Sequence, residues 1–346
     1  MQASLVLPSR AVEAKPRVVA AVETAGLLRK PEWVVLAFLI YAAILGAALP
    51  VAPAVGLRVV FLNLAIVGGY AVVIALDGRH QRLALSVTRD WAPLAVVILA
   101  YREMGWFAQP HLGHTLESHW VVWDQMVLRC GGKAMIESLG PALPSLLEIA
   151  YSLVYALAPF AVAMLCVYRR RERVDRFLLV FVTGVLLCYI QFPFWPSEPP
   201  RAVFYGQDFP AYDTIFRRFN WWMLGAYGIH TSVFPSAHVG GAFAAAFGIW
   251  RALPERRWLR RFLLTMSMAI AVATVYGRYH YLADAAAGLA MALFAAAIAW
   301  AVERSVLVPG RKARTTLSSV EVAVPAADRR PPDREKVDLN LESVLE

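Results

Sequence analysis

Two histidines in the sequence lie beside apolar segments and are of a type that could carry out phosphoryl transfer. His238 ends the stretch "FPSAH", and His280 lies within "YGRYHYLAD" together with Arg278 and Asp284. An imidazole can act as a nucleophile or as a proton donor near neutral pH. The guanidinium groups of Arg201 and Arg278 are planar, stay charged and match phosphate oxygens. Phosphoryl transfer depends mainly on positioning and on charge stabilisation, so these side chains predict a site for that reaction.

Each of these residues also has a purely structural interpretation. A lone histidine at a helix end is usually an interfacial residue, and a lone arginine usually contacts solvent or lipid headgroups. Ser236 after Pro235 is typical of a helix start, where a serine caps the backbone. Asp284 could form a helical polar pair with His280 and nothing more. Polar groups are costly in an apolar chain, however, and several of them at one membrane depth favour a shared functional site.

The elements that must position these residues are predicted to be membrane-spanning helices. The chain has 346 residues, of which 59% are hydrophobic, whereas a soluble domain has about 45–50%. Eight apolar segments approach the ~20 residues that cross a bilayer core, although Arg102 and Glu103 interrupt the third. The segments run Val34–Val51, Val59–Leu76, Ala92–Phe107, Leu143–Tyr168, Phe177–Phe194, Ala237–Leu253, Phe262–Tyr279 and Leu282–Val302.

Short basic loops predict how these spans are oriented. Residues 77–90, 168–176 and 251–261 are rich in arginine, and the positive-inside tendency places such loops in the cytoplasm. With eight spans, the N-terminus and the region after Glu303 fall on the same side. The connections that hold the two histidines and Arg201 then meet at the non-cytoplasmic face, because successive spans alternate in direction.

Composition argues against several other classes of protein. The net charge is +9, but the basic residues lie between apolar segments, as membrane orientation requires, and no nucleic-acid-binding module is present. The three cysteines, Cys130, Cys166 and Cys188, form neither a disulfide framework nor a metal spacing. No cluster of carboxylates or histidines resembles a metal cage, so neither a metal nor another cofactor is expected. The N-terminus lacks the pattern of a cleaved signal peptide.

Three short motifs resemble those of a known family. "PPR" at 199–201, "PSAH" at 235–238 and "RYHYLAD" at 278–284 occur in the order found in the type-2 phosphatidic acid phosphatase superfamily. The "HYLAD" ending is most similar to the branch related to inositol phosphorylceramide synthases. The segment "PALPSLLEIAYSLVYALAP" at 141–159 also resembles the first core helix of that branch. The resemblance covers roughly residues 120–300.

This resemblance implies a role for each candidate residue. His280 would attack phosphorus and form a phosphohistidine, and Asp284 would orient its imidazole, as a carboxylate does in a catalytic triad. His238 would protonate the leaving alkoxide. The phosphate oxygens would be held by Arg201, Ser236 and Arg278.

The sequence departs from the family pattern at three positions. Ala237 stands where the second motif has glycine, Phe194 where the first motif has lysine, and Thr274 where the third motif has arginine. The catalytic residues are unaffected, whereas the phosphate-binding set is incomplete, so Arg278 is only a stand-in for the missing arginine. Loss of the lysine favours the synthase-like branch over simple phosphatases.

The sequence therefore predicts an all-α integral membrane protein of about eight transmembrane helices, with a helical-bundle, phosphatase-type catalytic core in its C-terminal half. It would act on a lipid phosphate or phosphodiester, either as a phosphatase or as a headgroup phosphotransferase with an inositol-type polyol as acceptor. A carrier or channel that binds an anionic headgroup at the same polar cluster is the alternative, and a scaffolding homologue without activity is a third. The predicted parts are a cytoplasmic N-terminal segment (1–33), accessory helices (34–107), a non-cytoplasmic amphipathic segment (108–142), the core (143–304) and a disordered cytoplasmic tail (305–346).

One further residue is a candidate for headgroup contact. Asp124 follows the aromatic run from Trp120 to Trp123, and the orientation above places both on the catalytic side. An interfacial aromatic belt is the favoured explanation of these residues.

Overall fold

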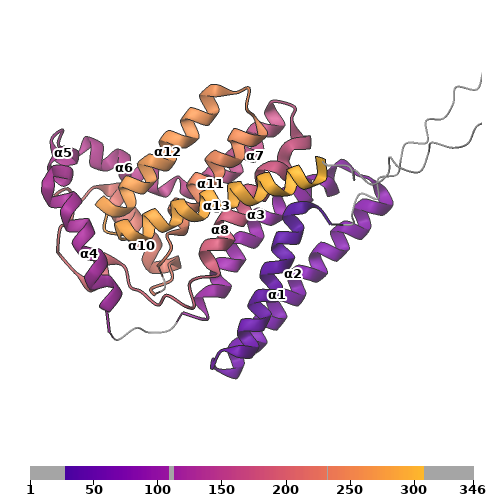
Figure 1. The fold of residues 1–346 in the computed structure, drawn as a ribbon, viewed down its shortest axis with the longest axis horizontal. Helices are drawn as coiled ribbons and strands as arrows, with labels where there is room; N and C mark the ends of the chain where they lie inside the picture. The colour runs from indigo at the N-terminus through magenta and orange to yellow at the C-terminus, as the bar shows by residue number, and fades with distance from the viewer. Residues whose placement is uncertain (1–27, 109–112, 232, 308–346) are drawn as a thin grey trace, which may run out of the picture. The chain divides into compact units, whose positions relative to one another are not determined.

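All regular structure in the described part of the chain is helical. The computed structural model describes residues 28–108, 113–231 and 233–307 (Figure 1). The all-helical prediction is confirmed for these residues, while most of the predicted N-terminal segment and tail lie outside them. The helices are α1 (Lys30–Ala48), α2 (Pro53–His80), α3 (Leu83–Gly105), α4 (Thr115–Val127), α5 (Lys133–Glu137), α6 (Ala142–Ser152), α7 (Val154–Val167), α8 (Val174–Tyr189), α9 (Pro200–Val203), α10 (Ile215–Tyr227), α11 (Ala237–Ala252), α12 (Arg257–Tyr276) and α13 (Leu282–Leu307), with a π-helical turn at Leu128–Gly132 and a 3₁₀ turn at Arg171–Arg173.

Five or six of these helices are long and apolar enough to cross a bilayer. The five are α1, α2, α3, α12 and α13, and the sixth is the pair α6–α7, which bends by 63°. The predicted fifth and sixth spans, α8 and α11, have 16 residues each, or about 24 Å of helix, less than the ~30 Å bilayer core. The predicted count of eight is therefore not confirmed.

The third predicted span is longer than its charges suggested. Helix α3 has 23 residues, because Arg102 and Glu103 fall in its last turn, near the end of the apolar stretch. Glu103 is completely buried, and the guanidinium carbon of Arg102 lies 5.8 Å from the ring centroid of Tyr227. Glu103 is thus enclosed by protein and Arg102 contacts an aromatic ring, and neither residue shortens the helix.

The short helices α8 and α11 pack directly against each other and against α13 through small residues. A Cβ atom on Gly240 of α11 would lie 2.6 Å from Sγ of Cys188 on α8. A Cβ atom on Gly288 of α13 would lie 2.4 Å from the carbonyl oxygen of Ser236. Only glycine permits such close approach, and small residues commonly allow membrane helices to pack this way. This contact sets the starts of α11 and α13 side by side.

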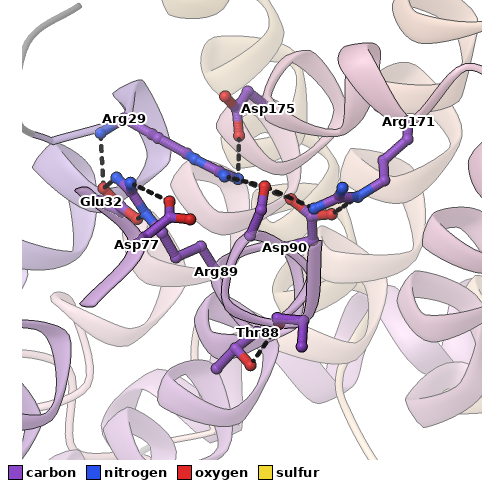
Figure 2. A network of polar contacts seen from close by, with 10 residues as sticks. Arg29, Glu32, Asp77, Thr88, Arg89, Asp90, Arg171 and Asp175 are labelled. Carbon is purple, nitrogen blue, oxygen red and sulfur yellow. Dashed lines mark hydrogen bonds and ion pairs between the residues drawn. The ribbon is translucent and has the colours of Figure 1, made fainter. Parts of the chain in front are cut away.

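A network of charged residues joins α1, α2 and α3 to the start of α8 (Figure 2). Arg89 of α3 contacts Glu32 of α1 at 2.7 Å and Asp77 of α2 at 3.1 Å. Asp90, the next residue of α3, accepts hydrogen bonds from Arg29 at 2.7 Å and from Arg171 at 2.5 Å. Breaking one partner of such a buried pair leaves an uncompensated charge, so the network fixes α3 against its neighbours.

Candidate active site

A cavity of about 260 Å³ lies among α3, α6, α7, α8 and α11 and contains three of the predicted site residues. Its wall includes both histidines, His238 and His280, and the guanidinium of Arg201. The rest of the wall is mainly aliphatic and aromatic, with contributions from Leu94 of α3 and Val185 of α8. The cavity therefore combines ionisable groups with an apolar surface.

The rings of His238 and His280 are near neighbours although 42 positions separate them in the chain. Their ring centroids lie 5.5 Å apart and the ring planes make an angle of 55°. Helix α11 begins just before His238 because Ser236 caps it, its hydroxyl accepting a hydrogen bond from the amide of Val239 at 3.4 Å. His280 lies two residues before the first residue of α13. Two helix starts thus bring the imidazoles together.

Asp284, in the first turn of α13, lies next to the imidazole of His280, which belongs to the loop before that helix. Its Oδ2 is 3.3 Å from Nδ1 of His280 and accepts a hydrogen bond from the amide of Tyr281 at 3.0 Å. Asp284 is completely buried. A carboxylate in this position can fix both the tautomer and the orientation of an imidazole.

Burial has a large effect on the protonation of His280. It lowers the pKa of His280 to about 3, the charge of Arg201 acts in the same direction, and a hydrogen bond with the backbone of Val233 opposes them. The imidazole is therefore neutral at physiological pH, which is the form that a nucleophile needs.

Arg201 connects the first motif to the third. It lies on the short helix α9, where its backbone amide donates a hydrogen bond to the carbonyl of Arg278 at 3.2 Å. Its Nη1 donates to the carbonyl of Tyr279, also at 3.2 Å. These contacts hold a cation at the cavity wall beside His280.

Ser236 and Arg278 occupy different surroundings from the other predicted phosphate ligands. Neither is among the residues that line the cavity, and both are completely buried. Ser236 caps α11. Nη1 of Arg278 donates to Oδ2 of Asp124 at 2.5 Å, while its Nε and Nη2 have no hydrogen-bond partner among the described residues.

Asp124 is buried within the protein, where it contacts two segments of the third motif. Besides the ion pair with Arg278, its Oδ1 accepts a hydrogen bond from the amide of Leu282, the first residue of α13, at 2.7 Å. Burial raises the pKa of Asp124 to about 6, and the bond from Leu282 and the charge of Arg278 act against this. Asp124 is thus ionised at neutral pH and anchors α4 to the start of α13.

A group of buried residues that was not predicted from the sequence forms hydrogen bonds with the segment before His280. Glu148 of α6 accepts hydrogen bonds from the hydroxyl of Tyr279 at 2.6 Å and from Asn220 at 2.7 Å. Arg217 of α10 donates to Glu148 at 3.1 Å and to the carbonyl of Gly277 at 3.2 Å. A lone acidic residue in an apolar span is a functional candidate, so Glu148 carried a usable signal.

Two tyrosines beside His238 were also missed. The ring of Tyr151 stacks on the imidazole with centroids 4.8 Å apart, and the hydroxyl of Tyr155 lies 3.1 Å from Nε2. Tyrosines four residues apart are common in apolar helices, so the sequence carried no signal that distinguished them from packing residues. Within the described ranges, no three His, Cys, Asp or Glu side chains are grouped so that they could hold a metal ion.

Comparison with known proteins agrees with the superfamily predicted from the motifs. Residues 135–298, a little under half of the chain, match the sequence model of the PAP2 superfamily. No curated protein and no solved structure matches the chain. The match gives no evidence for the inositol phosphorylceramide synthase-like branch. Together with the long apolar helices, it suggests an integral membrane protein with phosphatase-type, lipid-directed phosphoryl-transfer activity.

Proposed function

We propose that the protein is a membrane-embedded enzyme that transfers the phosphoryl group of a lipid phosphate or phosphodiester through a phosphohistidine at His280. The observation that carries this proposal is the 5.5 Å separation of the His238 and His280 ring centroids within one cavity that also contains Arg201. A tetrahedral phosphoryl group is small enough to contact all three. The superfamily match over residues 135–298 supports the same chemistry.

In the first half-reaction, the nitrogen of His280 that does not contact Asp284 forms a bond to phosphorus. The bond from phosphorus to the leaving oxygen breaks, and His238 supplies the proton that this oxygen takes up. Arg201 stabilises the charge on the phosphoryl oxygens, which is the largest requirement of phosphoryl transfer. In the second half-reaction, the oxygen of water or of an alcohol forms a bond to phosphorus while His238 accepts its proton, and the bond from phosphorus to His280 breaks.

Ser236 and Arg278 contribute to this site from behind it. The hydroxyl of Ser236 caps α11, and the helix N-terminus then favours an anion near His238. Arg278, through Asp124, fixes the first turn of α13, which carries Asp284. Both residues therefore keep the phosphate site in shape.

The acceptor in the second half-reaction is water for a phosphatase and a polyol such as inositol for a headgroup transferase. We place the active site at the non-cytoplasmic face, with both chain ends in the cytoplasm, because the arginine-rich loops at 77–90, 168–176 and 251–261 favour that orientation.

Product analysis tests the proposal and separates its two forms. Purified protein in detergent is incubated with a panel of lipid phosphates and phosphodiesters, with and without inositol. Release of inorganic phosphate identifies a phosphatase, and an inositol-containing phospholipid product identifies a transferase. Binding of the lipids without any turnover would favour the carrier or channel and contradict the proposal.

A further inference from the structure

His238, the general acid of the proposed reaction, has a tyrosine hydroxyl within hydrogen-bond distance of one ring nitrogen. The hydroxyl of Tyr155 lies 3.1 Å from Nε2 of His238, and it is the one side-chain hydrogen-bond partner of this imidazole found among the described residues. Tyr155 also lines the cavity, and 56% of its surface is exposed. Its hydroxyl thus stands between a ring nitrogen and the space that a substrate would enter.

The break between α6 and α7 creates this arrangement. Tyr151 near the end of α6 stacks on the imidazole at an angle of 15°, whereas Tyr155 near the start of α7 presents its ring at 77°. The two helices diverge by 63° at the break. The stacked ring fixes the plane of the imidazole, so Nε2 points at the hydroxyl of Tyr155.

An imidazole nitrogen has a single in-plane position for a proton or a lone pair. A leaving oxygen can therefore reach the proton on Nε2 only by displacing the Tyr155 hydroxyl or through it. A phenolic hydroxyl both donates and accepts hydrogen bonds, so it can pass a proton along without a net change in its own charge.

We infer that Tyr155 relays the proton between His238 and the leaving oxygen, an inference that rests on the proposed function. As the bond from phosphorus to the leaving oxygen breaks, that oxygen takes the hydroxyl proton of Tyr155. The phenol oxygen takes the proton of Nε2 in the same step, and the imidazolium of His238 returns to the neutral form that burial favours. The same path runs backwards when water or a polyol attacks the phosphohistidine, so atoms and charges balance over the cycle.

Substitution Y155F tests this relay because it keeps the ring and removes only the hydroxyl. With a lipid phosphate, whose alkoxide leaving group needs a proton, we expect turnover to fall about tenfold, the scale of one lost hydrogen bond. With p-nitrophenyl phosphate, whose leaving group needs no proton, we expect less than about a twofold change in the first-turnover release of p-nitrophenol, which precedes the attack of water on the phosphohistidine. The variant H238A should show the same dependence on the leaving group.

The matched control is Y168F, at the other end of α7, where the hydroxyl accepts a hydrogen bond from Trp258 and the residue does not line the cavity. This variant should retain wild-type rates with both substrates. The dependence of the turnover rate on the fraction of D₂O in the solvent gives a second readout. For the wild type, this dependence should indicate that two protons move in the rate-limiting step, and for Y155F that one proton moves.

Three outcomes would overturn the relay. Equal losses with both substrates would assign Tyr155 a structural role, and unchanged rates would assign it none. Retention of two protons in transfer by Y155F would place the path elsewhere. A wild type that turns over neither substrate would instead contradict the proposed function and, with it, this inference.

Discussion

The backbone amide of Ser236 donates a hydrogen bond to the backbone carbonyl of Asp284 at 3.0 Å. This bond joins the residue that caps α11 to the residue that orients His280. Because His238 lies two positions after Ser236 and His280 four positions before Asp284, one backbone contact sets the relative position of both imidazoles. The close approach at Gly288 reinforces it.

Removal of either imidazole should abolish turnover without unfolding the protein. We expect H280A and H238A each to reduce kcat with a lipid phosphate by at least about a hundredfold, the usual contribution of general acid–base groups. H119A on α4, where the histidine is exposed, is the matched control and should be fully active. Wild-type turnover by either site variant, measured as phosphate release, would refute the role given to that histidine.

The ion pair between Asp124 and Arg278 should support stability more than substrate binding. Each of D124N and R278A breaks a fully buried pair, which typically costs about 3–5 kcal/mol. We expect a clear fall in the thermal midpoint in detergent and little change in KM for the protein that remains folded. A large increase in KM with an unchanged midpoint would show instead that Arg278 binds the phosphate.

Arg201 should support binding of the phosphate group more than the stability of the fold. Its guanidinium lines the cavity, so R201K keeps the charge but loses the planar fork that matches two phosphate oxygens. We expect the rate constant kcat/KM to fall about tenfold or more, with little loss of thermal stability, when both are measured on the same preparation. An unchanged kcat/KM would remove Arg201 from the phosphate site.

The stability of the fold should decrease as the pH falls below neutral, in part because of His280. Its pKa is about 3 in the folded protein, mainly through burial, and about 6.5 in the unfolded chain. Between these values the unfolded state binds a proton that the folded state does not, so stability is full above pH ~6.5 and is lost towards pH ~3. The charge of Arg201 acts in the same direction as burial, and a hydrogen bond with the backbone of Val233 opposes both.

Thermal midpoints of the wild type and of H280Q across this range measure the effect. The slope of stability against pH should be shallower in H280Q. An identical slope in both proteins would mean that His280 does not contribute to it.

Turnover should not require a divalent metal, since the mechanism assigns every charge-stabilising role to side chains. We expect activity to survive prolonged treatment with a chelator, followed by gel filtration into chelator-containing buffer. Loss of turnover that is restored by a specific metal ion would contradict the mechanism.

The sequence predicted the helices of the core well and their lengths less well. Every predicted span contains a helix, because long apolar segments have few other ways to satisfy their backbone in a bilayer. The lengths of α8 and α11 were not predictable, because hydropathy continues past the last helical residue: Ile190 to Phe194 are largely apolar but lie in turns after α8.

The sequence could single out His238, His280 and Asp284 by type and spacing, and the structure brings these side chains together. It could not show that Arg278 pairs with Asp124, 154 positions away in the chain. Tyr155 was missed for the same reason: its contact with His238 depends on the bend between α6 and α7.

Trapping of the covalent intermediate tests the central claim most directly. The protein is mixed with a lipid phosphate labelled with ³²P, quenched in alkali and analysed for protein-bound label that is stable in base and labile in acid. We predict such label at His280 in the wild type and in H119A, and none in H280A. Full lipid turnover without label in the wild type, or label that persists in H280A, would contradict a phosphohistidine mechanism at this residue.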